Sequence, residues 1–394
     1  MSVKCEIKKN SNAWWVGGVD WNLRDFHGYT TERGSTYNAY LIVDEKIALV
    51  DTVKYYLVDE LIERVKEVVD PASIDYIISN HTEMDHSGGL TRLAALCPKA
   101  KILASANGVK NLSRHFPSLQ VTAVADGETL SLGRSTVSFH YEQMVHWPDN
   151  MATYHRESKI LFSNDAFGQH IASAERFDDE YNGGVLMEEA AKYYANIVWP
   201  YGAQVQKVLT ALGTLAIDII APSHGIIWRS MIADIMKKYW QWARNETKNT
   251  AVITYDTMWQ STALLAKALM RGLEDAGVPT TIYNAAVTPS SDIITAALEA
   301  KIIAVGSSTL NNNMLPTVAG FLTYLKGLAP KNRTGFAFGS YGWGGQAPKQ
   351  IHEMLAALEW SLPVDALRVQ FIPTEADIER AREAGRALAA SIQG

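Results

Sequence analysis

Apolar runs alternate with stretches of helical spacing in the last third of the chain. Each run is rich in β-branched or aromatic residues, and apolar positions every three to four residues follow it. Five such runs occur, at residues 251–255, 280–283, 301–305, 334–338 and 368–372. Strands that alternate with helices form parallel sheets, because each helix carries the chain back to the same edge. The pattern predicts a doubly wound parallel sheet in this region.

The earlier part of the chain has a less regular pattern. Strand-like runs and helical segments are interleaved there, with the strands expected at residues 36–43, 46–51, 74–79, 101–104, 136–141 and 159–163. This mixture predicts an α/β sandwich. A polar segment, QWARNETKNT at residues 241–250, separates the two patterns and has the composition of a linker. We therefore predict two domains, residues 1–247 and 248–394, as suits this chain length.

Composition and charge exclude several classes of protein. Apolar residues make up 47% of the chain and charged residues 20%, as in a folded protein with a sizeable core. The net charge is −6 without any basic stretch, so nucleic acid and membrane surfaces are not expected partners. Two cysteines, Cys5 and Cys97, are too few for a disulfide framework or a four-cysteine iron centre. We expect no signal peptide and no membrane span, and hence a cytoplasmic location.

One short segment concentrates candidate metal ligands. The sequence NHTEMDHSGG at residues 80–89 follows an apolar strand-like run, and a helix is expected to begin at Leu90. Loops at strand ends are where α/β proteins place their chemistry. Imidazole and carboxylate ligands without a nearby thiolate suit iron, manganese or zinc, whereas a solvated polar loop is the simpler alternative. The candidate ligands in this segment are His81, Glu83, Asp85 and His86.

Three later residues extend this set. His146, Asp165 and His224 each stand at or just after the end of a strand-like run. Together the seven residues offer four imidazoles and three carboxylates, which is too many for one ion and suits a pair bridged by one acid. Two divalent cations would be neutralised by three carboxylates and a bridging hydroxide, as a partly buried site requires.

The seven residues resemble the metal ligands of the flavodiiron proteins, whose metal domain has a metallo-β-lactamase-like αββα fold. Segments 19–22, 36–40 and 192–196 also resemble segments of that family. Zinc hydrolases of this fold usually have a histidine where this chain has Glu83, and the more anionic site favours iron. The resemblance implies one iron at His81, Glu83 and His146, a second at Asp85, His86 and His224, and a bridge at Asp165.

Two further residues enter through the same resemblance. The family places a histidine near the diiron pocket, and His27 takes that position here. His27 and Tyr194 could each donate a hydrogen bond or a proton to bound oxygen species, while a loop histidine and a packed tyrosine are the plain alternatives. Surface or structural positions are expected for most of the remaining histidines, His115, His140, His155, His170 and His352.

The C-terminal region offers a site for FMN. A Ser/Thr-rich turn, residues 254–262, leads from its first strand into a helix, whose backbone N–H groups can bind a monophosphate. An ordinary helix cap uses the same residues, but the position after the first strand of a flavodoxin-like sheet favours FMN. Trp343 is a candidate to pack on the flavin ring, or else a surface-covering tryptophan. The expected FMN contacts are Thr257, Met258, Trp259, Gln260, Ser261, Thr262, Ser308, Thr309, Leu310, Asn311, Asn312, Ser340, Tyr341, Gly342, Trp343 and Gly344.

These sites together indicate a flavodiiron oxidoreductase, in which FMN passes electrons to a non-haem diiron site. The resemblance implies reduction of dioxygen to water as the first expectation, with nitric oxide reduction to nitrous oxide as a close variant. It also implies an external donor, such as rubredoxin or the reduced deazaflavin F420. The family further implies a head-to-tail homodimer, or a dimer of such dimers. A zinc-dependent metallo-hydrolase and an FMN redox relay with structural metals are the alternatives.

Overall fold

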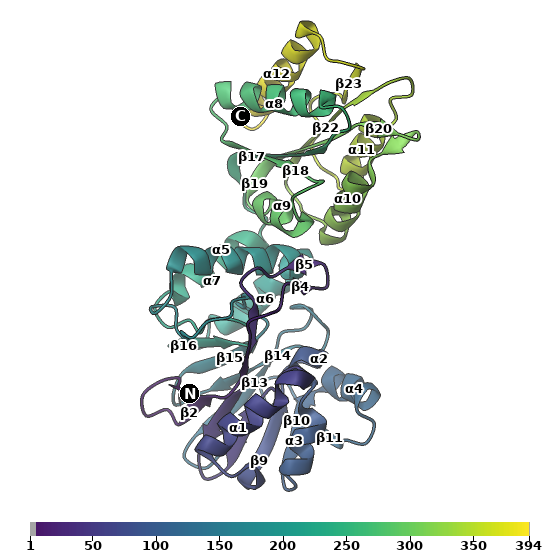
Figure 1. Cartoon of the computed structure of the whole chain (residues 1–394). Helices are drawn as coiled ribbons and strands as arrows, with labels where there is room; N and C mark the ends of the chain where they lie inside the picture. The colour runs from purple at the N-terminus through teal and green to yellow at the C-terminus, as the bar shows by residue number, and fades with distance from the viewer. Residues whose placement is uncertain (1–4, 394) are drawn as a thin grey trace. The chain divides into compact units, whose positions relative to one another are not determined.

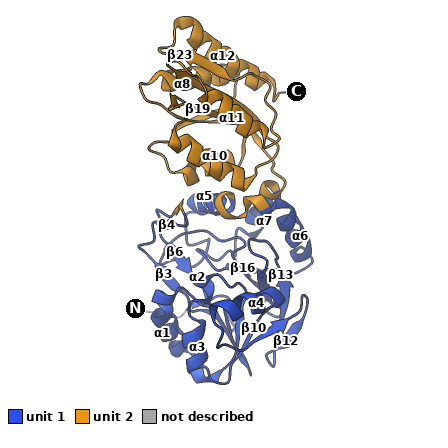
Figure 2. Ribbon diagram, turned by 90° about the vertical axis from the view of Figure 1, so that its right-hand side faces the viewer, with its two compact units in different colours: residues 1–27, 31–194, 201–240 blue, residues 28–30, 195–200, 241–394 orange. Residues whose placement is uncertain are grey.

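The computed structural model describes residues 5–393 and divides into two compact units (Figure 2). Unit 1 contains residues 5–27, Thr31–Tyr194 and Tyr201–Trp240, and unit 2 contains Gly28–Thr30, Ala195–Pro200 and residues 241–393. The predicted linker is mostly structured, because its ends continue a helix and a strand, α7 (Ile232–Ala243) and β17 (Lys248–Asp256). Its buried Trp242 explains why helix α7 extends into a segment that is polar overall.

Two mixed sheets form the centre of unit 1 (Figure 1). The first has the order β1-β2-β7-β8-β9-β10-β11, with strands Cys5–Glu6, Ala13–Trp15, Tyr40–Val43, Ile47–Val50, Ile74–Ser79, Lys101–Ser105 and Val121–Val124. The second has the order β12-β13-β14-β15-β16, with strands Thr129–Ser131, Thr136–Tyr141, Met151–His155, Ile160–Asn164 and Ile219–Pro222. Shorter strands precede β7, namely β3 (Gly18–Asp20), β4 (Asp25–Phe26), β5 (Tyr29–Thr30) and β6 (Ser35–Tyr37). The predicted strand at 36–43 is thus two strands, β6 and β7.

Alternating residues of the first sheet enter two different cores. On β7 and β8, Tyr40 and Val50 pack with Phe139 and Phe162 of the second sheet. Their neighbours on the same strands face the other way and pack with three helices, α1 (Val58–Val68), α3 (Leu90–Leu96) and α4 (Ala106–His115). A strand buried on both faces reads as a continuous apolar run, because each face contacts a separate apolar layer. The first sheet therefore lies between a helical layer and the second sheet.

Three helices accompany the second sheet. In both ribbon views α5 (Gly183–Tyr193), α6 (Gly202–Leu212) and α7 lie beside β16 (Figures 1 and 2). A π turn at Tyr194–Val198 and a 3₁₀ turn at Trp199–Tyr201 connect α5 to α6. With the helices on the first sheet, this arrangement confirms the predicted αββα sandwich.

Unit 2 contains one parallel sheet of five strands. Its order is β18-β17-β19-β22-β23, the order of doubly wound flavodoxin-like sheets. Each predicted strand is present, as β17 and then β18 (Thr280–Asn284), β19 (Ala300–Ser307), β22 (Thr334–Tyr341) and β23 (Leu367–Gln370). A small hairpin, β20 (Thr309–Leu310) with β21 (Asn313–Met314), follows β19. The predicted doubly wound sheet is confirmed.

Helices cover both faces of this sheet. Residues of α8 (Ser261–Asp275) and α12 (Glu375–Ala390) share a core with β17, β19 and β22. These two helices pack closely at Gly272, where an added Cβ would lie 2.1 Å from the Arg382 carbonyl oxygen. The opposite face carries α9 (Ser290–Ala297), α10 (Pro316–Leu328) and α11 (Ala347–Ala356) (Figure 1). The carboxyl ends of the parallel strands thus share one edge of the sheet.

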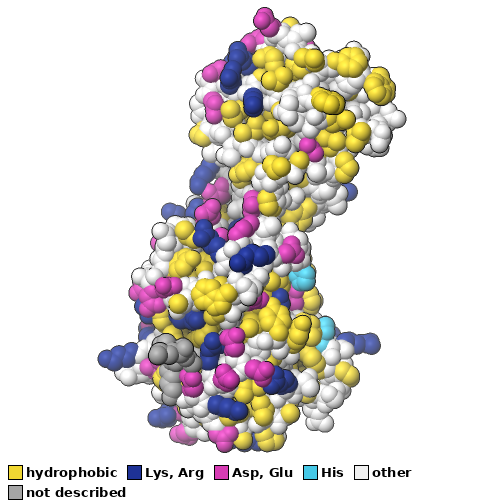
Figure 3. Space-filling view, in the orientation of Figure 1, with side chains coloured by type: hydrophobic (Ala, Val, Ile, Leu, Met, Phe, Trp, Pro, Cys, Tyr) yellow, Lys and Arg dark blue, Asp and Glu magenta, His cyan; other side chains and the backbone are white. Residues whose placement is uncertain are grey.

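Charged and hydrophobic side chains are both exposed on the surface of the protein. In the view of Figure 3, Lys and Arg side chains are interspersed with Asp and Glu, and hydrophobic side chains are exposed on both units. Within residues 5–393, no helix has the length and apolar character that crossing a bilayer requires.

Candidate metal and flavin sites

Loops at the ends of four strands bring all seven predicted metal ligands together. His81 follows β9, His146 follows β13, Asp165 follows β15 and His224 follows β16. Asp85 and His86 lie on a short helix that the sequence analysis took for a loop, α2 (Met84–Ser87). The side chains form two groups, in each of which the ligand atoms lie within 4.8 Å of one another: His81, Glu83, His146 and Asp165, and then Asp85, His86 and His224.

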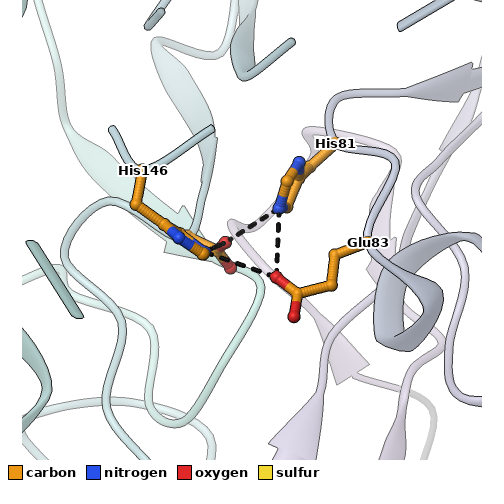
Figure 4. A group of neighbouring side chains, drawn as sticks. His81, Glu83 and His146 are labelled. Atoms are coloured by element: carbon orange, nitrogen blue, oxygen red, sulfur yellow. Dashed lines mark hydrogen bonds and ion pairs between the residues drawn. The ribbon is translucent and has the colours of Figure 1, made fainter. Parts of the chain in front are cut away.

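The first group converges on one point (Figure 4). Oε2 of Glu83 lies 3.4 Å from Nε2 of His81 and 3.4 Å from Nε2 of His146. Oδ2 of Asp165 lies 3.5 and 3.2 Å from the same two nitrogens. Two imidazoles and two carboxylates therefore face a common centre, which is the donor set of a borderline divalent cation.

The second group has the same chemistry. Asp85 places one oxygen 3.4 Å from Nε2 of His86 and the other 3.4 Å from Nε2 of His224. Oδ1 of Asp165 lies 3.1 and 3.5 Å from these nitrogens. The two oxygens of Asp165 thus serve different groups, Oδ2 the first and Oδ1 the second. A carboxylate shared in this way can bridge two cations.

Unsatisfied polar atoms show that these residues fit a metal pair. Both carboxylate oxygens of Asp85 and both ring nitrogens of His86 are buried without a hydrogen-bond partner among the described residues. Buried polar atoms almost always have a partner, because losing water without replacement costs about 1–3 kcal/mol per group. Bound cations would supply the missing partners of the two oxygens and of Nε2 of His86.

Other residues fix the orientation of the histidine rings. Nδ1–H of His81 donates to Asp149 over 3.0 Å, and Nδ1–H of His224 donates to the Thr36 carbonyl oxygen over 2.8 Å. Each bond turns Nε2 towards the pocket and sets the tautomer that a metal ligand needs. Asp149 was not predicted as part of the site, although it lies only three residues beyond His146 in the chain.

Asp51, which was not predicted either, connects the two loops that carry His81 and Asp165. Its carboxylate accepts hydrogen bonds from the Asn80 N–H at 2.7 Å, the Asn80 side chain at 3.1 Å and the Asn164 side chain at 3.2 Å. Asn80 and Asn164 immediately precede His81 and Asp165. Burial raises the pKa of Asp51 to about 6, against the lowering effect of His86 and of these hydrogen bonds. In the sequence it is an unremarkable acid at the end of a strand.

The charges of the site compensate one another in the absence of metal. Burial lowers the pKa of His81, but its bonds to Asp149 and Glu83 outweigh burial and raise the pKa to about 10. The pKa values of His86 and His146 rise to about 9 for the same balance of causes, with Asp165 acting on both. Burial opposes ionisation of Asp165, yet these histidines hold its pKa well below the ordinary value.

We expect metal binding to release protons and to tighten as pH rises. Cations need neutral imidazoles, so at pH 7 they must displace protons from His81, His86 and His146. The raised pKa values stabilise the metal-free fold fully below the ordinary value of 6.5 and stop doing so as pH passes 9 to 10. Titrating metal-free protein with ferrous or zinc ions in weak buffer should therefore acidify the solution at pH 7. Binding that leaves the pH unchanged would contradict this charge balance.

The two predicted second-sphere residues occupy different surroundings. Nε2 of His27 lies 3.4 Å from Oε1 of Glu83, and its side chain is 76% exposed. Tyr194 is buried and its ring packs 5.0 Å from that of Tyr239. The adjacent Tyr193 is the residue beside the metal ligands, since its ring lies 5.9 Å from that of His224. Catalytic roles for His27 and Tyr194 stay predictions.

Among the five histidines expected at surface or structural positions, His170 lies beside the metal ligands. It is fully buried, its ring lies 4.8 Å from that of His224, and its Nδ1 lies 2.8 Å from the Ser35 hydroxyl. Burial, reinforced by the charge of His224, holds the pKa of His170 well below its usual range. A neutral imidazole therefore lies behind a metal-site histidine. No spacing in the sequence links His170 to the ligand set.

The carboxyl edge of the sheet in unit 2 borders a cavity of about 610 Å³. This volume suits a small cofactor. Twelve of the sixteen predicted FMN contacts line it: Met258, Trp259, Ser261, Ser308, Thr309, Asn311, Asn312, Ser340, Tyr341, Gly342, Trp343 and Gly344. Thr257, Gln260, Thr262 and Leu310 are absent from the lining, whereas Phe371 and Ile372 belong to it and were not predicted. They were missed because the predicted last strand, residues 368–372, included both residues, whereas β23 ends at Gln370 and leaves them in the loop that follows.

The polar end of this cavity fits a phosphate group. Helix α8 begins there, and its N-cap residue Gln260 makes no side-chain hydrogen bond to the helix, which leaves backbone N–H groups for an anion. The buried hydroxyl of Thr257 lacks a hydrogen-bond partner within residues 5–393. The Thr262 hydroxyl instead lies 3.0 Å from that of Ser308 and 2.8 Å from that of Ser340. Thr262 thus links the start of helix α8 to the end of strand β22 and to the residue that follows strand β19.

Comparisons with known proteins agree with both units. Residues 36–225 match the ODP family beta lactamase model and residues 253–385 match the flavodoxin model. The chain is 46% identical to the nitric oxide reductase of Moorella thermoacetica, over 96% of this chain and 97% of that one. The rubredoxin oxygen:oxidoreductase structure from Desulfovibrio gigas is 40% identical with a TM-score of 0.97, covering 99% of each chain. The flavodiiron protein structure from Giardia intestinalis is 31% identical with a TM-score of 0.96, covering 99% and 97%.

These matches extend over both units, and they include enzymes named for the reduction of nitric oxide and of oxygen. The β-lactamase-like fold of the first unit and the flavodoxin fold of the second are confirmed. The chain is an oxidoreductase and belongs to the flavodiiron protein family.

Proposed function

We propose that the protein reduces dioxygen or nitric oxide at a pair of iron ions, with electrons that arrive through FMN. The observation that carries the proposal is the split of Asp165, whose two oxygens face two separate imidazole and carboxylate groups. Such a donor set is built for two cations. A hydrolase would use the same ligands but would have no task for the flavin cavity of unit 2.

The residues of the first group would hold one iron and those of the second group the other, bridged by Asp165. Glu83 stands where a third nitrogen ligand would favour zinc, so the donor set is harder and more anionic. When bound, the irons and the flavin supply the one-electron and two-electron chemistry, and together they store the four electrons that dioxygen reduction consumes.

Residues around the metal ligands would orient the imidazoles and supply protons. Asp149 and the Thr36 carbonyl hold the imidazoles of His81 and His224 with Nε2 towards the pocket, as metal ligands require. His27 is the exposed titratable group next to Glu83, and its Nε2 can pass a proton from solvent towards the pocket. Both gas reductions consume protons, so a solvent-facing imidazole at this place serves either substrate.

A head-to-tail homodimer, or a dimer of such dimers, would bring the two sites together. Both units expose large apolar side chains, among them Trp21, Tyr55, Tyr56 and Met84 on unit 1 and, lining the cavity of unit 2, Met258, Trp259, Trp343, Phe371 and Ile372. Trp259 and Trp343 are 87% and 90% exposed and line one cavity with other apolar side chains, and grouped exposed aromatic residues are typical of interfaces. An external donor, rubredoxin or reduced F420, would reduce the flavin, and the cytoplasm is the proposed location.

We expect protein produced with iron to carry about two irons and one FMN per chain, because each cation group and the phosphate-binding turn would be filled. Metal analysis and an absorption spectrum measure both quantities. A colourless protein filled with zinc would support the hydrolase alternative instead, and a flavin-containing protein with redox-inert metals would support the relay.

Gas specificity needs a separate measurement. The reduced protein should be mixed anaerobically with dioxygen or with nitric oxide, and gas uptake and nitrous oxide formation should be followed. Rapid reoxidation by at least one gas, with water or nitrous oxide as product, is the expected result. Reoxidation by neither gas, in protein with full iron and flavin content, would overturn the proposed function.

A further inference from the structure

The buried histidines of the two metal groups differ in what their outer nitrogen contacts. Nδ1–H of His81 donates to the Asp149 carboxylate over 3.0 Å. Nδ1–H of His224 donates to a neutral backbone carbonyl over 2.8 Å. Nδ1 of His86 has no hydrogen-bond partner in the described part of the chain. In the first group, Nδ1 of the buried histidine contacts an anion. In the second group, one Nδ1 contacts a neutral carbonyl and the other has no hydrogen-bond partner in the described part of the chain.

This difference is isolated, because the inner ligands of the two groups match. Each group has two imidazoles, one carboxylate of its own and one oxygen of Asp165. The charge of the ligands themselves therefore does not make either iron easier to reduce than the other. The remaining histidine, His146, has a side chain that is 17% exposed, so solvent reaches part of its ring.

Asp149 is held firmly in this role. Its Oδ2 also accepts from the Thr82 N–H at 2.8 Å, and its Oδ1 accepts from the Asn111 side chain at 3.2 Å. The side chain is wholly buried, so solvent does not screen its charge. A carboxylate on the outer nitrogen makes an imidazole a more basic ligand, and a more basic ligand favours the higher charge state of the metal.

We infer that Asp149, acting through His81, makes the iron at His81, Glu83 and His146 the harder one to reduce, so that the first electron from the flavin resides on the iron at Asp85, His86 and His224. The inference rests on the proposed diiron site. The step is a one-electron reduction of ferric to ferrous ion, with reduced flavin as the electron source. Asp149 is a positioning residue, since it acts on the iron only through the imidazole.

Redox titration of the iron-loaded wild type and of Asp149→Asn tests the inference. Two one-electron steps are expected, and the substitution should raise the lower potential while leaving the higher one in place. A tenfold shift of the equilibrium towards ferrous ion corresponds to about 59 mV for one electron, and a shift of about this size is the expected result. A shift of the higher potential, or of neither, would overturn the inference.

Mössbauer spectra of the one-electron-reduced protein give a second readout. The ferric doublet that persists in the wild type should be the doublet that changes in Asp149→Asn. Asp51→Asn is the matched control, because it removes a buried carboxyl beside the site that contacts no ligand imidazole. If both substitutions shift the lower potential equally, charge through space is the cause and the hydrogen bond to His81 is not.

A third variant keeps the test independent of iron retention in Asp149→Asn. Asn111→Ala removes one donor to Asp149 and leaves more of its charge for His81, so the lower potential should fall. A rise would overturn the inference. Failure of the proposed function would be visible separately, as absent iron or flavin or as inertness towards both gases in the wild type.

Discussion

Asp165→Ala is expected to abolish gas reduction while the donor still reduces the flavin. The two oxygens of Asp165 approach the four metal-site imidazoles to between 3.1 and 3.5 Å. Without this carboxylate each cation loses a ligand and the pair loses its bridge. Loss of an outer partner alone costs about 10- to 100-fold, so loss of this shared ligand should lower gas turnover by more than about 100-fold.

Stopped-flow absorption separates the two steps, because flavin reduction by the donor and reoxidation by gas are observed in different mixing experiments. Asp218→Ala is a suitable control, since Asp218 is an acid of the same unit with a 45% exposed side chain. Its variant should keep both rates. If Asp165→Ala slowed flavin reduction as strongly as reoxidation, the division of labour between the two sites would be wrong.

A mixture of two inactive variants should regain about a quarter of wild-type activity. One variant is His224→Ala, which lacks a metal ligand, and the other carries Ser261→Asp and Met258→Glu in the flavin cavity. Ser261 and Met258 line that cavity, so the new charges repel the phosphate, whereas a charge at the buried Thr262 would break the hydroxyl contacts behind it. In a head-to-tail dimer, each mixed pair keeps one working combination of flavin and iron.

Random exchange makes half of the dimers mixed, and one of two combinations works in each, which gives the expected quarter. Differently tagged chains allow the mixed dimers to be purified and their activity to be measured directly. Mixed dimers without activity would mean that electrons pass within one chain. A monomer in solution would contradict the dimer itself.

The kinds of metal ligand were predictable from the sequence, because they occupy fixed places after strands. His81, Glu83, Asp85 and His86 lie within six residues, and each later candidate ends a strand-like run. Asp149 and Asp51 were not predictable in the same way. Both acids act through hydrogen bonds to loops that are distant in the sequence. The sequence alone does not show which loops the fold brings next to an acid near a strand end.

The second unit was easier to predict than the first. The central strands β17, β19 and β22 are largely buried on both faces and read as apolar runs, whereas the edge strands β18 and β23 were recognised from their β-branched and aromatic residues. In unit 1 the strand β14 was missed, because MATYH has no clear alternation, and the strand-like run before His224 was recognised without bounds, because IIAP is only four residues long. Helix α2 was missed as well, since four residues between a turn and two glycines show no helical period.

The positions of His170 and Tyr193 beside the metal ligands could not be predicted from residue spacing. Both lie next to His224 in space, but the sequence separates each from His224 by tens of residues with no shared motif. Aromatic and imidazole rings that pack behind ligands are selected by shape. Only the folded arrangement identifies them.

Two short segments from the earlier part of the chain belong to unit 2, and this has a consequence for protein engineering. Gly28–Thr30 and Ala195–Pro200 belong to that unit, where the Thr30 N–H donates to the Ser291 hydroxyl and the Tyr324 hydroxyl donates to the Asn196 side chain. A fragment that starts at residue 241 lacks both segments and leaves polar groups of α9 and α10 without these partners. A flavin module cut from this enzyme for reuse in another electron-transfer protein would therefore need substitutes for Thr30 and Asn196 at those two helices.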